Sequence, residues 1–192
     1  TEESLKLSSN ENPFGPLPGV LESATAALGQ VNRYPDPATS QLRELLANRL
    51  RLAADQLCFG TGSVAVLYAL LNAWWAAGDG VVDAGRSFES YPIAVGLTGA
   101  GSVQSALTRD GRDDLSAMAS AITEQTKVVL VCSPNNPTGT TFGLDTVVAA
   151  YDAFDGILVV DEAYHEFDAE HESAVSLLEG RPRLLVSRTM SK

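Results

Sequence analysis

Residues 127–139 read KVVLVCSPNNPTG, an apolar run that gives way at once to two prolines and two asparagines. The unbroken apolar stretch 128–132 indicates a strand covered on both faces, because a half-exposed strand would alternate between apolar and polar residues. The same arrangement returns at residues 156–164, GILVVDEAY, where Asp161 follows the run. Strands of this kind predict a mostly parallel sheet at the centre of the protein.

Helical and strand-like segments alternate on both sides of these two stretches. Helices are expected at 18–31, 38–50, 63–77, 89–100, 113–122 and 144–154, and strands at 56–59, 80–85, 102–107, 127–132, 156–164 and 182–189. The alternation predicts an α/β fold, a mostly parallel sheet sandwiched by helices and preceded by an N-terminal arm. Gly29 is expected to end the first helix, and Asp36 to cap the second.

Composition excludes some classes of function. The chain has 192 residues, of which 45% are hydrophobic and 19% charged, as in ordinary globular proteins. Its formal net charge of -11 repels phosphate backbones and anionic lipids, so nucleic acid and membrane surfaces are not expected partners. Neither a signal peptide nor an apolar run of bilayer length is seen, and we expect the cytoplasm.

The two cysteines, Cys58 and Cys132, each lie in an apolar stretch. Buried free thiols are therefore expected, in a reducing compartment. The two histidines, His165 and His171, are far from both cysteines in the sequence, so we expect no metal site.

Residues that follow the strands matter most, because open parallel sheets bind ligands beyond the carboxyl ends of their strands. GTGS at 60–63 leads into a helix and is either an anion site or only a tight turn. Asp161 is either a cap or the partner of a cation, and Lys192 either a surface lysine or a site residue. Taken together, a phosphate cradle, an amide, an acid, a phenol and a lysine suit pyridoxal phosphate.

Seven stretches carry a resemblance to a known family. They are SSNENPFGP (8–16), NRYPD (32–36), GTGSV (60–64), RSFESYP (86–92), SPNNPTG (133–139), VVDEAY (159–164) and SRTMSK (187–192). In this order they resemble the fold-type I pyridoxal-phosphate aminotransferases of the histidinol-phosphate aminotransferase group. Val64 and Ala65 stand where that group often has two acids, which makes the chain more similar to its aromatic, phenylalanine-type branch.

The resemblance implies roles around the cofactor ring. Lys192 is expected to bind pyridoxal phosphate covalently and then to act as the base that moves the substrate α-proton. Asp161 is expected to pair with the ring nitrogen, and Phe88 to stack on the ring. Tyr164 and Asn136 are expected to hydrogen-bond the phenolic oxygen of the cofactor.

The resemblance also implies phosphate, substrate and partner contacts. Four residues are expected to hold the cofactor phosphate: Ser63, Val64 through its backbone, Thr189 and Ser191. Tyr34 is expected to reach the phosphate of the neighbouring subunit, which implies a homodimer with shared active sites. Asn12 and Asn136 are expected near the substrate.

The expected reaction moves an amino group between an aromatic amino acid and a 2-oxo acid such as 2-oxoglutarate. Alternatives are histidinol-phosphate aminotransferase, a decarboxylase of the same fold, and a non-catalytic cofactor-binding module of a regulator. Residues 1–35 are expected to contribute to a small domain and the dimer interface, and residues 36–192 to form most of the cofactor-binding large domain. We expect the natural protein to continue past Lys192, towards an arginine that holds the substrate carboxylate.

Overall fold

The structure is a computed structural model, which describes residue 6, residues 8–74 and residues 76–192. The described residues divide into two compact units. One comprises the residues up to Phe59 together with Lys192, and the other is Gly60–Ser191. The functional boundary expected after residue 35 stays a prediction.

The first unit contains helices α1 (Val20–Leu28) and α2 (Ser40–Leu50) and the short 3-10 helix η1 (Ala54–Gln56). Helix α1 ends before Gly29, as predicted. Helix α2 begins later than predicted, because Asp36 closes a turn ahead of it. The Asp36 carboxylate accepts hydrogen bonds from the backbone N–H of Ala38 at 2.9 Å and of Ser40 at 2.8 Å. Thr39, with φ 49°, is the flanking residue of the helix.

The strand predicted at 56–59 is wrong. The guanidinium of Arg43 donates to the carbonyl oxygens of Ala54 and Leu57 and lies 5.1 Å from the centre of the Phe59 ring. A side chain, rather than a neighbouring strand, therefore donates hydrogen bonds to the backbone carbonyl groups of this segment. Cys58 was predicted to be buried but is exposed, since successive side chains of an extended chain point to opposite sides.

The second unit confirms the α/β prediction. Five strands lie in the order β2 (Gly101–Ser105), β1 (Gly80–Ala84), β3 (Thr126–Cys132), β4 (Ile157–Asp161) and β5 (Leu184–Ser187), and every neighbouring pair is parallel. Strands β3 and β4 are almost fully buried, as their apolar runs predicted. Strand β2 is largely exposed because it is an edge strand with a polar sequence.

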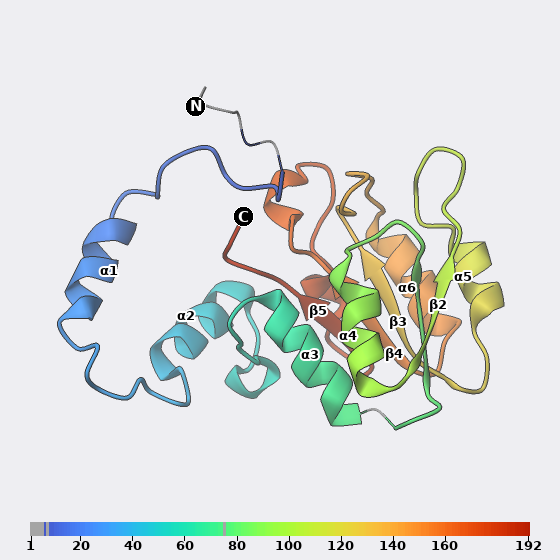
Figure 1. Cartoon of the computed structure of the whole chain (residues 1–192), viewed down its shortest axis with the longest axis horizontal. Coiled ribbons are helices and arrows are strands. Elements are labelled where there is room, and N and C mark those ends of the chain that lie inside the picture. The colour runs from blue at the N-terminus through green and yellow to red at the C-terminus, as the bar shows by residue number, and fades with distance from the viewer. Residues whose placement is uncertain (1–5, 7, 75) are drawn as a thin grey trace. The chain divides into compact units, whose positions relative to one another are not determined.

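Helices cover both faces of this sheet (Figure 1). Helices α3 (Ser63–Trp74) and α4 (Ser90–Thr98) pack on one face, around Leu71, Val81 and Leu130. Helices α5 (Leu115–Ala121) and α6 (Leu144–Asp152) pack on the other, around Val129 and Leu158, together with the 3-10 helix η3 (Ala174–Leu177). A further 3-10 helix, η2 (His165–Phe167), follows β4.

Candidate active site

The sheet changes its direction of winding between β1 and β3. Strand β2 lies on one side of β1 and β3 on the other, so the loops after β1 and β3 diverge from one point, where open α/β sheets bind ligands. A buried side chain, Asn135, joins these loops: its Oδ1 accepts from the hydroxyl of Ser87 at 2.9 Å, and its Nδ2 donates to the carbonyl of Arg86 at 2.9 Å. The loops are thereby held in one fixed arrangement.

Asp161, the last residue of β4, places a buried carboxylate at this edge. Its Oδ2 accepts a 2.8 Å hydrogen bond from the hydroxyl of Tyr91, and its Oδ1 accepts one of 3.1 Å from the N–H of Ala163. Burial raises the pKa of the Asp161 carboxyl, and these two hydrogen bonds offset only part of that effect. A cation placed against this carboxylate would favour its ionised form.

Two aromatic residues that were predicted to contact the cofactor, Phe88 and Tyr164, follow strands β1 and β4. Phe88, after β1, meets Tyr91 edge to face, with ring centres 5.7 Å apart and planes at 88°. Because Tyr91 contacts Asp161, the Phe88 ring belongs to the surroundings of this acid. Tyr164, three residues after β4, is half-buried, and its ring centre lies 6.3 Å from that of Phe167. Asn136, half-buried, follows β3.

The predicted phosphate residues lie at the start of α3 and after β5. Gly62, with φ +93°, turns the chain into α3, which begins at Ser63 and Val64. A Cβ at Gly60 would lie 3.0 Å from the side chain of Val66, so a larger residue there would push against the first turns of α3. After β5, the hydroxyl groups of Thr189 and Ser191 lie 3.0 Å apart. Backbone N–H groups of a helix start and paired hydroxyls are suitable donors for an anion.

Arg188 is held by two acids that follow β4. Its Nη2 donates to Oε1 of Glu166 at 2.7 Å, and its Nε lies 3.9 Å from Oε2 of Glu162. Glu162 is buried and also accepts 2.6 Å hydrogen bonds from the Ser173 hydroxyl and the Ala174 N–H. The segment that carries Thr189 is thus anchored to the segment that carries Asp161.

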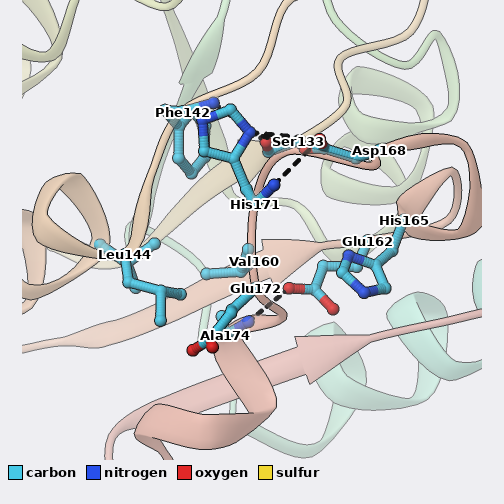
Figure 2. A pocket seen from close by; sticks show the side chains of 11 residues that line it. Ser133, Phe142, Leu144, Val160, Glu162, His165, Asp168, His171, Glu172 and Ala174 are labelled. Atoms are coloured by element: carbon cyan, nitrogen blue, oxygen red, sulfur yellow. Dashed lines mark hydrogen bonds and ion pairs between the residues drawn. The ribbon is translucent and has the colours of Figure 1, made fainter.

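Figure 2 shows a pocket beside Glu162, between Leu144 at the start of α6 and the segment 165–174. Glu162 points towards Ala174, and Nδ1 of His171 faces Asp168, 3.0 Å from Oδ2. The cavity volume is about 10 Å³, room for no more than a water molecule. This pocket is therefore too small for a cofactor or substrate.

Three predicted site residues belong to the other unit. Asn12 forms a local turn, in which its Oδ1 accepts from the N–H of Phe14 at 2.9 Å, and Tyr34 is fully exposed. Lys192 groups with the same unit. The roles of these three residues stay predictions.

Tyr91, like Asn135, was not among the predicted site residues. It lies in the stretch RSFESYP, three residues after Phe88, but no role was predicted for it. The available signal was its position, since Tyr91 is a polar aromatic residue in the first turn of the largely apolar helix that follows β1.

The sequence profile of the family described as aminotransferase class I and II matches residues 2–192. The chain belongs to this family. Aromatic amino acid aminotransferases from Streptomyces avermitilis and Cutibacterium acnes are 48% and 43% identical, over 97% and 100% of the chain. These alignments cover 53% and 55% of those proteins, so the chain spans about half the length of the curated relatives it matches.

Solved aminotransferase structures have the same fold. Histidinol-phosphate aminotransferase from Sinorhizobium meliloti, in complex with pyridoxal-5'-phosphate, is 29% identical with a TM-score of 0.90, over 96% of this chain and 51% of that one. Aspartate aminotransferase from Thermus thermophilus with maleate is 28% identical with a TM-score of 0.85, over 96% and 52%. The fold predicted from the sequence is thus that of the class I and II aminotransferases.

Metal-binding clusters and membrane-spanning helices are both absent from the described residues, 6, 8–74 and 76–192. Among them, no group of three or more histidine, cysteine, aspartate or glutamate side chains is arranged to hold a metal ion. None of the helices in this part of the chain is long and apolar enough to span a membrane.

Proposed function

We propose that this protein is a pyridoxal-phosphate-dependent aminotransferase that moves an amino group between an aromatic amino acid and a 2-oxo acid such as 2-oxoglutarate. The observation that carries the proposal is the Asp161 carboxylate, buried at the carboxyl end of β4 and held by Tyr91 and Ala163. Family membership and the names of the curated relatives support the reaction and the aromatic substrate.

The described residues fit the cofactor. Asp161 would hold the ring nitrogen in its protonated form, since burial leaves this carboxylate in need of a cationic partner. Phe88 would cover the ring, and Asn136 and Tyr164 would bind its phenolic oxygen. When bound, pyridoxal phosphate supplies an electron sink for the carbanion formed at the substrate α-carbon.

The remaining polar groups would bind the phosphate and move the proton. Ser63, the Val64 backbone, Thr189 and Ser191 would donate to the phosphate; the turn at Gly60 and Gly62 that starts α3 supports this assignment. Lys192 would hold the cofactor covalently until the substrate amine displaces it, and the released lysine amine would then take the α-proton of the substrate. Asn12 would contact the substrate together with Asn136.

We further propose a homodimer in which Tyr34 reaches the phosphate of the neighbouring subunit. Support comes from exposed apolar side chains within residues 14–34 of the first unit, which are Phe14, Leu17, Val20, Leu21, Leu28, Val31 and Tyr34. Helix α1 has no buried residue. Apolar groups gathered in one segment favour association with another surface.

A cytoplasmic location is also proposed, supported by the free thiols of Cys58 and Cys132.

Histidinol-phosphate aminotransferase is the second candidate, favoured by the likeness to the Sinorhizobium meliloti structure. The two candidates are separated by assay of the complete protein with pyridoxal phosphate and 2-oxoglutarate, using phenylalanine or histidinol phosphate as amino donor. We expect phenylpyruvate and glutamate in equal amounts, with a kcat/KM for phenylalanine about tenfold or more above that for histidinol phosphate. The reverse ranking would support the second candidate, and release of carbon dioxide would support a decarboxylase.

A further inference from the structure

Tyr91 makes a buried contact with the acid proposed to serve the cofactor ring. The residue lies in the first turn of α4 and is 1% exposed. Its hydroxyl donates to Oδ2 of Asp161 at 2.8 Å, across 70 residues of sequence. The tyrosine is itself held in place, because its N–H donates to the carbonyl of Phe88 at 3.0 Å and its ring meets the Phe88 ring edge to face.

The Asp161 carboxylate is thereby held at both oxygens. Tyr91 binds Oδ2, and the N–H of Ala163 binds Oδ1 at 3.1 Å. Two donors from different elements fix the plane of the carboxylate. Each carboxylate oxygen can accept more than one hydrogen bond, so this arrangement orients the group and still leaves it able to accept another donor.

The hydrogen bond also changes the basicity of the carboxylate. Burial raises the pKa of Asp161, whereas the Tyr91 hydroxyl, which favours the ionised form, lowers it. Burial also raises the pKa of Tyr91 well above its ordinary value, so the phenol keeps its proton and remains a donor at neutral pH. The neighbouring thiol of Cys132 has its pKa raised to about 12, again by burial, and stays neutral.

We propose that Tyr91 is a positioning residue that sets the direction and the basicity of the Asp161 carboxylate towards the ring nitrogen of pyridoxal phosphate. This inference rests on the proposed function. Donation from Tyr91 draws electron density from Oδ2, so the proton shared between Asp161 and the ring stays on the ring nitrogen. Without this donor the carboxylate is more basic, and the shared proton moves towards it.

The test uses the complete protein loaded with pyridoxal phosphate labelled with ¹⁵N in the ring. Tyr91→Phe removes the hydroxyl and keeps the ring, and Tyr151→Phe is the matched control. Tyr151 is also buried, but it belongs to the core on the opposite face and lies beside Arg183. In Tyr91→Phe we expect the ring ¹⁵N resonance to move towards that of an unprotonated pyridine. We also expect kcat to fall about tenfold with little change in KM. Tyr151→Phe should resemble the wild type in each respect.

The outcomes separate this inference from the proposed function. A wild-type protein that does not bind pyridoxal phosphate would overturn both. If the wild type binds the cofactor and Asp161→Asn changes the ring signal, a wild-type spectrum for Tyr91→Phe overturns the role of Tyr91 alone.

Should Tyr91→Phe not fold, 3-fluorotyrosine placed at position 91 keeps the shape of the side chain, and its hydroxyl is a more acidic, stronger donor. It should move the resonance in the opposite direction, and an unchanged resonance would overturn the inference.

Discussion

The hydroxyl of Ser87 donates to Oδ1 of Asn135 over 2.9 Å, joining the loop after β1 to the loop after β3. Asn135 uses its other side-chain atom as well, since Nδ2 donates to the carbonyl of Arg86 and to the hydroxyl of Thr138, each at 2.9 Å. One buried amide therefore connects the segments that carry Phe88 and Asn136.

Asn135→Ala should destabilise the protein and weaken cofactor binding. The substitution leaves buried partners without hydrogen bonds, at a cost of about 2–4 kcal/mol in the free energy of unfolding. Chemical denaturation and a titration with pyridoxal phosphate measure the two effects. Asn72→Ala, at an exposed position in α3, is the control. Equal stability of the two variants would show that Asn135 does not hold these loops.

Asp161→Asn should keep the bound cofactor but slow the reaction by about 10²-fold or more. The amide cannot stabilise a protonated ring nitrogen as a carboxylate does, and each ~1.4 kcal/mol of lost stabilisation is a factor of ten in rate. Cofactor absorbance and kcat are measured together, with the exposed Asp152→Asn as control. A rate equal to that of the wild type would reduce Asp161 to a structural cap.

Asp83 and Asp113 should make stability fall as the pH rises. Burial raises the pKa of each carboxyl from 3.8 to about 6. The folded state binds these two protons more tightly than the unfolded state does. Below pH 4 both carboxyl groups are protonated in the folded state, and their burial then lowers the free energy of unfolding only a little. As the pH rises from about 4 to about 6, the free energy of unfolding falls by up to about 3 kcal/mol per group.

The substitution Asp83→Asn tests this pH dependence. The variant should gain stability over the wild type at pH 8, and the gain should shrink towards pH 4. Thermal unfolding at both pH values is the measurement, with the exposed Asp155→Asn as the matched control. A gain that is the same at both pH values would show that ionisation of Asp83 is not the cause.

Tyr34→Ala and Lys192→Ala should complement each other when their subunits are mixed. If Tyr34 serves the neighbouring subunit, each mixed dimer regains one intact site. Random exchange of subunits should then restore about a quarter of the wild-type activity. Native mass spectrometry reports whether mixed dimers form. Mixed dimers without activity, or full activity in a monomeric wild type, would refute shared sites.

The sequence predicted the sheet well because buried parallel strands leave an unambiguous pattern. The apolar runs of β3 and β4 allowed their strands and the acid that follows to be located without knowledge of the partners. The segment 56–59 was misread because apolar character alone does not provide a neighbouring strand. There the side chain of Arg43 donates a hydrogen bond to the backbone carbonyl of Leu57, an interaction that the spacing of the two residues in the sequence does not reveal.

The position of Asp161 was predictable because an acid at the end of an apolar run marks the carboxyl end of a buried strand. Its role comes from the resemblance and stays a prediction. Tyr91 and Asn135 act through contacts with residues 70 and 48 positions away, which only the fold brings together. Cys58 shows a related limit, since its apolar neighbours face one way and the thiol the other.

Residues at the carboxyl ends of these strands are proposed to form a pyridoxal-phosphate site served by Lys192. The most direct measurement is to incubate the complete protein with pyridoxal phosphate, fix the bound cofactor by reduction with borohydride, and locate it by peptide mass spectrometry. We expect one label per chain, on Lys192, and no label in Lys192→Ala. A label on another lysine, or no label on protein that has been shown to be folded, would contradict this proposal.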